Sequence, residues 1–306
     1  MFPFQLLFNK LAFQILLKKN VDVVYVYSPN ILFLPIYLAC VLRRVPLHIE
    51  KTELDSIKQQ ENSKDIVNRF LYKMDEFIAP RLATSLITIS NRLTSHYQQI
   101  SSKPIFQLTA FIPYHALNWK SGNEPEKRDG ITLGYLGSFG LKDDLHTLIE
   151  AYKRLRGEGL PINLKMVGRA PSHLNQSEDY NEIELTGELP AHQLLAALSD
   201  CDLMVAIRKD SDYANYGFPS KLAEYFMTSK PIICSRSSDI PDLLEHKKQV
   251  YLIQSEQTDE LVEAIRWLFE HRTDATEIGM SGNRWALDHW HPDRVLVDWS
   301  EWIFRS

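Results

Sequence analysis

The sequence lacks the features that would hold a chain together through covalent links or metal ions. Its three cysteines, Cys40, Cys201 and Cys234, are far apart and show no Cys-x-x-Cys spacing. This number and spacing argue against a disulfide framework or a zinc site and favour small buried side chains in a cytoplasmic protein. The ten histidines show neither His-Glu-x-x-His nor another metal-binding spacing. We therefore expect no bound metal.

Long apolar runs and an excess of positive charge are also absent. The longest apolar stretch, residues 31–42, is well short of the roughly 20 residues that span a bilayer, so no transmembrane helix is predicted. The formal net charge is −5 at pH 7, which gives no general attraction to nucleic acid. An anionic ligand must therefore be held by a few local cations, and single arginine and lysine residues become informative.

The first 19 residues are largely apolar, but their pattern does not predict a signal peptide. Lys10 interrupts the run and two lysines end it, the reverse of the basic start of a signal sequence. An amphipathic helix is the better interpretation. We expect it to pack on a sheet, and the alternative is that it rests on an anionic membrane face. The predicted location is the cytoplasm, with peripheral association at the inner face of the plasma membrane left open.

The length and composition suit two folded domains. The chain has 306 residues, 44% of them apolar and 24% charged. A polar segment without an apolar period, Asn118 to Gly130, predicts the linker between them. We expect an N-terminal domain over residues 1–120 and a second domain over residues 131–288.

Short β-branched runs in both halves are typical of parallel strands buried on both faces. In the first half, extended segments are expected at 21–27, 47–50, 85–89 and 105–112, with helices that include 31–44 and 91–100. In the second half, strands are expected at 131–136, 163–167, 183–185, 203–206, 231–234 and 250–253. The second half is therefore predicted to be a doubly wound α/β domain. The first half has no Gly-rich turn after an opening strand, and we expect it to lack its first strands.

Ligands of doubly wound sheets bind where strands end and helices begin. Gly137-Ser138-Phe139-Gly140-Leu141-Lys142 follows the first strand of the second half, and its glycines would let the backbone approach a ligand while Lys142 adds charge. A tight turn with a solvated lysine is the alternative. Gly168 with Arg169 follows the next strand and gives a weaker signal, because Arg169 could simply be exposed.

The segment Gly217-Phe218-Pro219-Ser220-Lys221-Leu222-Ala223-Glu224 is predicted to begin a helix. Pro219 suits a first helical turn, and the free amides and dipole of such a turn bind anions. Glu224 lies three residues after Lys221 and on the same face. With a cation at the start of the helix and a carboxylate one turn later, the cation would suit a phosphate and the carboxylate would suit ribose hydroxyls. The alternative is an exposed ion pair worth only tenths of a kcal/mol.

Together these segments resemble the nucleotide-binding half of retaining glycosyltransferases of the GT-B fold, family four (group 1), which includes many bacterial polysaccharide and lipopolysaccharide enzymes. The order and spacing of the matching segments are specific over about 160 residues, whereas most are common individually. They are Gly134-Tyr-Leu-Gly-Ser138, Lys142-Asp-Asp, Leu148-Ile-Glu-Ala-Tyr152, Met166-Val-Gly168, Thr186-Gly187-Glu188, Arg208, Gly217-Phe-Pro-Ser-Lys-Leu-Ala-Glu224-Tyr and Lys230-Pro-Ile-Ile233.

The resemblance implies two Rossmann-like domains that face a cleft, with residues 289–306 forming a helix that packs back on the first domain. It implies that Arg208 and Lys221 contact the diphosphate and stabilise its charge during catalysis, and that Glu224 takes the ribose hydroxyls. Further donor-binding residues would be Gly137, Ser138, Lys142, Gly168, Gly217, Phe218, Pro219 and Ser220. Glu50 and Glu53, after a first-half strand, are candidates for the acceptor side.

The sequence departs from the family at one position of the site. A second glutamate near the donor sugar is common eight residues before Glu224, where this chain has Tyr216. The triplet Asp210-Ser-Asp212 imitates the metal-binding Asp-x-Asp of another glycosyltransferase fold, but it lies in a polar stretch beside Arg208, and we expect a loop there.

The predicted function is transfer of a sugar from an NDP-sugar, a co-substrate, to a glycan or lipid-linked acceptor, with no cofactor and no metal. Two alternatives remain open at this point. The chain could be an inactive or partner-subunit protein that binds nucleotide sugars, because the opening strand and glycine loop of the family are not found. It could also be a sugar-nucleotide epimerase, which shares the two-domain shape but not the residues quoted.

Overall fold

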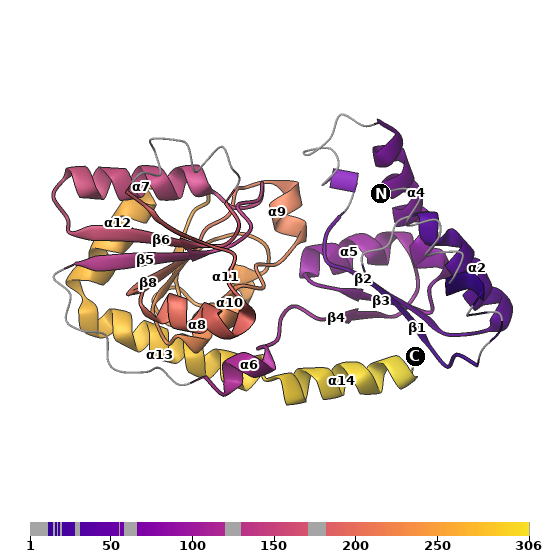
Figure 1. The fold of residues 1–306 in the computed structure, drawn as a ribbon. Coiled ribbons are helices and arrows are strands. Elements are labelled where there is room, and N and C mark those ends of the chain that lie inside the picture. The colour runs from indigo at the N-terminus through magenta and orange to yellow at the C-terminus, as the bar shows by residue number, and fades with distance from the viewer. Residues whose placement is uncertain are drawn as a thin grey trace. The chain divides into compact units, whose positions relative to one another are not determined.

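The computed structural model describes residues 12–14, 16, 18, 20–27, 31–54, 56–57, 66–119, 130–170 and 182–305. The chain divides into two compact units (Figure 1). Unit 1 comprises Met1–Thr109, Asn215–Phe218 and Leu296–Ser306, and unit 2 comprises Ala110–Ala214 and Pro219–Val295. Most of the helix predicted over residues 1–19, and residues 120–129 of the predicted linker, lie outside the described residues.

Unit 1 is built on a parallel sheet with the strand order β1-β2-β3-β4. Because every crossover is right-handed and each strand is added on the same side, the connecting helices share one face of the sheet. The strands are β1 Val24–Tyr27, β2 Leu47–Lys51, β3 Ser85–Thr88 and β4 Ile105–Gln107; the connecting helices are η1 Ile31–Phe33, α2 Leu34–Arg43, α4 Ile66–Leu82 and α5 Asn91–Ile100.

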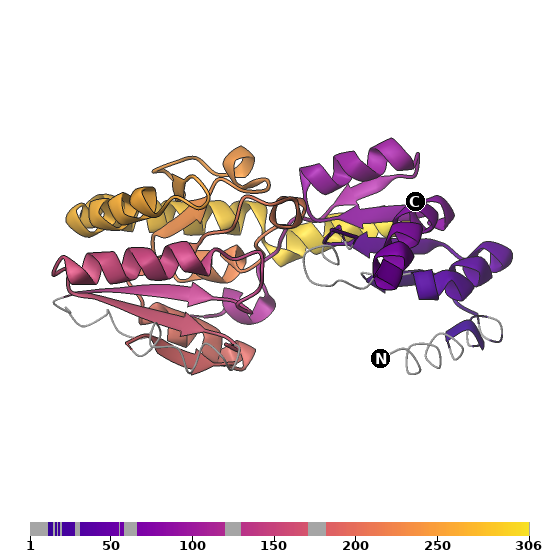
Figure 2. The same ribbon diagram turned by 90° about the horizontal axis from the view of Figure 1, so that it is seen from above.

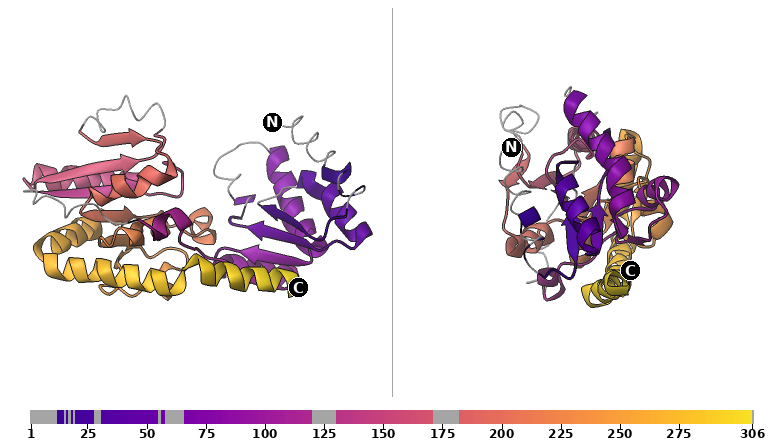
Figure 3. Two further views of the ribbon diagram at one scale, coloured as in Figure 1. Left: turned by 60° about the horizontal axis from the view of Figure 1, so that its bottom comes forward. Right: turned by 90° about the vertical axis from the view of Figure 1, so that its right-hand side faces the viewer.

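Strand β2 shows which elements cover each face of this sheet. Lys51 reaches Asp75 of α4, while His48, on the opposite side of the strand, lies 6.3 Å from the ring of Trp302. Trp302 belongs to α14, Pro292–Arg305, and also packs on Phe106 of β4 at 5.3 Å. The helices α2 and α4 therefore cover one face, and the end of α14 covers the other, where Figure 3 shows it running along the sheet.

Unit 2 contains a parallel six-stranded sheet with the order β10-β9-β8-β5-β6-β7. The order reverses between β5 and β8, so the topological switch point of a doubly wound sheet lies there. The strands are β5 Ile131–Leu136, β6 Ile162–Val167, β7 Glu184–Gly187, β8 Leu203–Ala206, β9 Ile232–Ser235 and β10 Tyr251–Ile253. The doubly wound fold predicted for this half is confirmed, and each strand lies within two residues of its predicted bounds.

The core of unit 2 joins the sheet to α7 and α12, which pack against each other. Figure 2 shows α7 lying along the strands. Another group of helices forms around α10, which contacts α6, α8 and α13. The helices are α6 Tyr114–Leu117, α7 Leu145–Gly157, α8 Ala191–Ser199, α9 Asp212–Tyr216, α10 Leu222–Met227, α11 Ile240–Leu243, α12 Thr258–Glu270 and α13 Arg272–His289. Within the described residues, no helix is both long and apolar enough to cross a membrane.

A buried ion pair joins β2 to α4 in unit 1. The Lys51 ammonium lies 2.8 Å from the Asp75 carboxylate, and both side chains are almost fully buried. The Tyr37 hydroxyl donates a hydrogen bond to the other Asp75 oxygen at 3.1 Å. Burial raises the pKa of Asp75, and the Lys51 charge opposes that rise. Removal of the carboxylate would take away the ion pair that offsets the cost of burying the Lys51 charge.

We predict that Asp75→Ala lowers the free energy of unfolding by about 3–5 kcal/mol, because it removes the carboxylate that offsets the burial of the Lys51 ammonium. The double variant Lys51→Met with Asp75→Leu should recover most of this loss, since no buried charge remains. Urea unfolding of the full chain measures both. The exposed pair Arg305–Glu301, replaced in the same way, serves as the control and should cost less than about 1 kcal/mol. An Asp75→Ala variant no less stable than this control would contradict the prediction.

Candidate active site

The loops that follow β5 and β8 are joined at the switch point of unit 2. The Lys209 backbone N–H donates to the Lys142 carbonyl at 3.0 Å, and Asp143 and Arg208 form an antiparallel bridge. The carboxyl ends of the two strands are therefore fixed relative to each other. Ligands of doubly wound sheets bind at this place, because the strand order reverses there and leaves a crevice.

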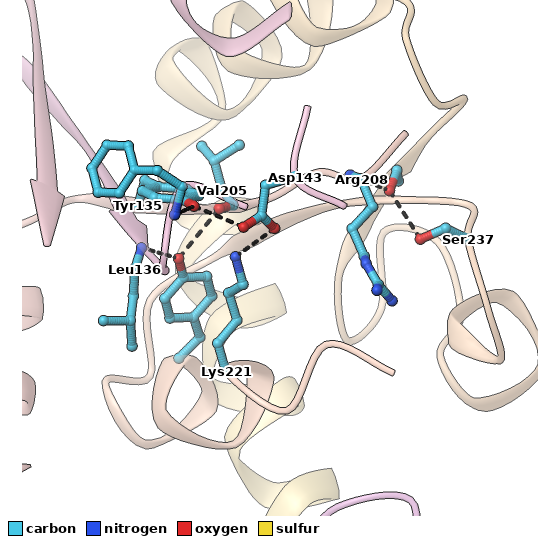
Figure 4. A network of polar contacts seen from close by, with 10 residues as sticks. Tyr135, Leu136, Asp143, Val205, Arg208, Lys221 and Ser237 are labelled. Atoms are coloured by element: carbon cyan, nitrogen blue, oxygen red, sulfur yellow. Dashed lines mark hydrogen bonds and ion pairs between the residues drawn. The ribbon is translucent and has the colours of Figure 1, made fainter. Parts of the chain in front are cut away.

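Asp143 is the centre of the polar network in these loops (Figure 4). One carboxylate oxygen lies 2.8 Å from the Lys221 ammonium, and the other accepts a hydrogen bond from the Tyr135 hydroxyl at 2.8 Å. The ammonium also lies 4.5 Å from the centre of the Tyr135 ring. Asp143 and Lys221, 78 positions apart in sequence, thus meet directly, and Tyr135 of β5 contacts both.

The charge of Lys221 depends on this arrangement. Burial lowers the pKa of its ammonium, the Asp143 carboxylate raises it, and the Arg208 charge lowers it again. The carboxylate therefore offsets part of the cost of keeping a positive charge in this setting. Burial also raises the pKa of Tyr135, as does the adjacent Asp143 charge, so the phenol is neutral and acts as a hydrogen-bond donor.

Tyr225 fixes α10 against the two strands of the switch point. Its hydroxyl accepts a hydrogen bond from the Leu136 N–H at 2.6 Å and lies within 3.3 Å of the Val205 carbonyl, to which it donates. The side chain is fully buried, and burial raises its pKa, so that it too is neutral. Because Lys221 is the N-cap of α10, this anchor also positions the ammonium.

The helix predicted to begin at Gly217 begins later, so this prediction is wrong. Helix α10 starts at Leu222 and has six residues. Pro219 lies in a preceding turn, where its carbonyl accepts from the Leu222 N–H at 3.0 Å and the Ser220 carbonyl accepts from the Ala223 N–H at 3.1 Å. These two amides are thus occupied by the turn. Local turn geometry prevails over the first-turn preference of proline.

The two side chains expected to share one helix face point to different partners. Lys221 turns to Asp143 instead of Glu224. Glu224 is half-buried; burial raises the pKa of its carboxyl, while its own backbone N–H and the charge of His115 in α6 lower it. The exposed ion pair considered as an alternative is not what the structure shows.

Arg208, the other predicted cation, is almost fully buried, with 3% of its surface exposed. Its backbone N–H donates to the Ser235 hydroxyl at 2.9 Å, and Ser235 lies 3.1 Å from the Ser237 hydroxyl. Figure 4 shows Arg208 and Ser237 at the same end of the polar network. Its charge acts on Lys221, so both predicted cations belong to the same electrostatic environment.

The predicted glycines are explained by contacts between the loops. Gly168 has φ +137°, and a Cβ there would lie 1.9 Å from the Gly137 carbonyl oxygen. A Cβ at Gly137 would lie 2.2 Å from the Tyr135 hydroxyl. A side chain at Gly168 would therefore force the loops apart, and one at Gly137 would displace the Tyr135 side chain. The role of these glycines toward a donor stays a prediction.

The remaining predicted donor-side residues differ in their exposure and in the unit to which they belong. The Lys142 ammonium lies 4.4 Å from the ring centre of Tyr213. Ser138 and Ser220 are exposed and Pro219 is buried. Gly217 and Phe218, both buried, are grouped with unit 1.

Glu50 and Glu53, the predicted acceptor-side residues, lie in unit 1. Glu50 is on β2 between Tyr27 of β1 and Ile87 of β3, and burial raises the pKa of its carboxyl to about 7. Glu53 lies two residues beyond the end of β2 and is half-buried.

Sequence reasoning assigned no role to Asp143, Tyr135 or Tyr225. Asp143 stands in the matching segment Lys142-Asp-Asp, and its place just past a strand end was the one available signal. The tyrosines lie inside a predicted strand and a predicted helix, where the sequence pattern indicates residues of the core. As for metals, the described residues contain no group of three or more His, Cys, Asp or Glu side chains able to hold an ion.

Residues 130–271 match the sequence profile of the family described as Glycosyl transferases group 1. The predicted resemblance to this family is confirmed. The chain is 25% identical over 162 residues to "Putative colanic acid biosynthesis glycosyltransferase WcaL" of Escherichia coli K12, a match that covers 51% of this chain and 40% of that protein. The matching segment thus spans less than half the length of the curated relatives.

Solved structures extend the likeness to the whole fold. Anabaena Alr3699/HepE in complex with UDP-glucose superposes with a TM-score of 0.73 at 15% identity, covering 97% of this chain and 81% of that one. Sucrose-phosphate synthase from Thermosynechococcus elongatus gives a TM-score of 0.73 at 14% identity, covering 97% and 77%. The chain has the GT-B fold of these proteins, as the sequence predicted.

The pKa of Glu50 leads to a prediction about stability and pH. A carboxyl whose pKa is about 7 in the folded chain and about 4.5 unfolded stabilises the fold when protonated. This contribution is complete below the unfolded pKa and is lost as pH rises through the folded pKa. Glu50→Gln has no carboxyl to ionise at this position and so avoids the loss. The free energy of unfolding of the variant minus that of the original chain should therefore increase as pH rises from about 4.5 to about 7.

Urea unfolding of both chains at about pH 5 and about pH 8 measures this difference. A Glu50→Gln variant whose stability changes with pH in parallel with the original chain would show that the carboxyl titrates normally.

Proposed function

We propose that the chain is a glycosyltransferase that moves a sugar from an NDP-sugar to a glycan or lipid-linked acceptor, with retention of anomeric configuration. The observation that carries the proposal is the placement of two cations, the buried Arg208 and the partly buried Lys221, at the switch point of a doubly wound sheet. A nucleotide diphosphate is an anion of the size and charge that such a place accommodates. The UDP-glucose complex of the HepE neighbour supports this choice of ligand.

The proposed chemistry depends on charge that develops on the leaving group. As the bond between the anomeric carbon and the diphosphate oxygen breaks, negative charge grows on the diphosphate. Lys221 is already oriented by Asp143 and by the anchored helix α10, so it needs little reorganisation to stabilise that charge. Together with Arg208 it would stabilise the transition state more than the ground state. We propose that these cations take the place of a metal ion.

The other predicted residues complete the proposal. Glu224 would accept the ribose hydroxyls; the loop residues Gly137, Ser138, Lys142 and Gly168, and the segment Gly217–Ser220, would line the donor. Glu50 and Glu53 would serve the acceptor side. The name of the WcaL relative supports a role in cell-surface polysaccharide synthesis, which we place at the inner face of the plasma membrane.

We predict that the chain binds UDP or GDP and that Arg208→Ala and Lys221→Met each weaken binding about tenfold or more, because each removes a charge-assisted contact to the diphosphate. Isothermal titration calorimetry on the full chain measures the affinities. Arg154→Ala, on the exposed side of α7 in the same unit, is the matched control and should bind as the original chain does.

Absence of binding for both nucleotides, or equal affinity in the variants, would contradict the donor assignment. A radiolabelled sugar transferred to a lipid-linked acceptor tests the catalytic part separately. Tight nucleotide binding without transfer to any acceptor would favour the binding-subunit alternative.

A further inference from the structure

Helix α4 exposes a stripe in which aromatic and basic side chains alternate. Phe70 and Phe77 are 60% and 57% exposed, and Lys73 and Arg81 are exposed beside them. Their spacing of three and four residues puts all four on one side of the helix. The Arg81 guanidinium lies 3.6 Å from the centre of the Phe77 ring, so a cation and an aromatic ring already share this surface.

Helix α2 exposes a comparable surface. Leu38, Val41 and Leu42 are exposed, the last at 77%, and their spacing again places them on one side of the helix. The helix ends at Arg43, and Arg44 caps it with φ 55°. Both arginines are exposed. The apolar stripe therefore ends in two positive charges.

The two stripes lie on one surface of unit 1. Helices α2 and α4 are neighbours on the same face of the sheet, joined by the hydrogen bond from Tyr37 to Asp75. Their sides opposite the sheet consequently face outward together. We call this surface the α2–α4 face; it consists of Leu38, Val41, Leu42, Phe70 and Phe77 with Arg43, Arg44, Lys73 and Arg81.

The neighbouring helix α5 shows that exposed apolar residues are not general in this layer. Its exposed side chains are all polar: Asn91, Arg92, Ser95, Gln98 and Gln99. Among α2, α4 and α5, the exposed apolar side chains are thus confined to α2 and α4. Clusters of this kind on a folded protein mark sites of interaction.

The charge on the α2–α4 face has one sign. Helix α2 contains no acidic residue. Both acids of α4 are turned inward, Asp75 to Lys51 and Glu76 to the Ser56 N–H, whose hydrogen bond is 2.8 Å long. The side chains described for these two helices therefore include no exposed acid, in a chain whose net charge is −5.

We propose that the α2–α4 face docks on the surface of a bilayer that contains anionic phospholipids. The apolar and aromatic side chains would enter the boundary between headgroups and acyl chains, while the cations would contact lipid phosphates. Apolar residues bordered by cations alone match an anionic lipid surface. The inference rests on the exposed residues of unit 1 and does not depend on the donor site of unit 2.

The test is co-sedimentation of the full chain with vesicles of phosphatidylcholine alone and of phosphatidylcholine mixed with phosphatidylglycerol. We expect binding to the mixed vesicles that weakens with added salt, and little binding to phosphatidylcholine. Loss of each cation should weaken binding about fivefold, so Lys73→Gln with Arg81→Gln should weaken it about 25-fold. Phe70→Ser with Phe77→Ser should also reduce binding strongly.

A matched control uses exposed apolar residues elsewhere in unit 1. Val297→Ser with Phe304→Ser, on α14, should leave vesicle binding unchanged. Circular dichroism checks that each variant is folded, and the Lys73→Gln and Arg81→Gln changes touch only exposed side chains. The proposal is overturned if the original chain does not bind mixed vesicles, if the α14 control loses as much binding, or if the α4 variants bind undiminished. It is also overturned if size-exclusion chromatography shows that Phe70 and Phe77 instead hold two copies of the chain together without vesicle binding.

Discussion

The hydrogen-bonded carboxylate of Asp143 is the contact on which the candidate site depends. It joins a residue of the central strand, Tyr135, to the ammonium of Lys221 at the start of α10. An ammonium removed from water is costly unless a carboxylate accompanies it. The carboxylate therefore favours the charged form of Lys221 at the place where a doubly wound sheet accepts its ligand.

The rest of unit 2 holds this contact in place. Tyr225 ties α10 to the ends of β5 and β8, and the backbone bridge between Asp143 and Arg208 joins the loops that follow the same two strands. Gly168 lets a third loop approach Gly137, which no other residue would allow. A cation fixed by so many backbone and side-chain contacts is oriented before any ligand arrives, which is the condition for electrostatic stabilisation of a leaving group.

Local sequence patterns identify the strands of this chain but not the contacts between residues far apart in sequence. The strands at 131–136 and 203–206 were predicted at their observed bounds, because short continuous apolar runs mark buried parallel strands. The start of α10 was missed, because a turn around Pro219 takes the amides that a helix would leave free. Sequence order alone could not reveal that Lys221 pairs with Asp143, 78 residues away. The outward apolar surface of α2 and α4 was equally hidden, since it appears only when their buried sides are known.

The most direct measurement is a crystal structure of the full chain with UDP. Our account predicts the diphosphate at the carboxyl ends of β5 and β8, with its oxygens in hydrogen-bond contact with the Lys221 ammonium and the Arg208 guanidinium. A diphosphate bound elsewhere, with Lys221 still paired only to Asp143, would contradict it.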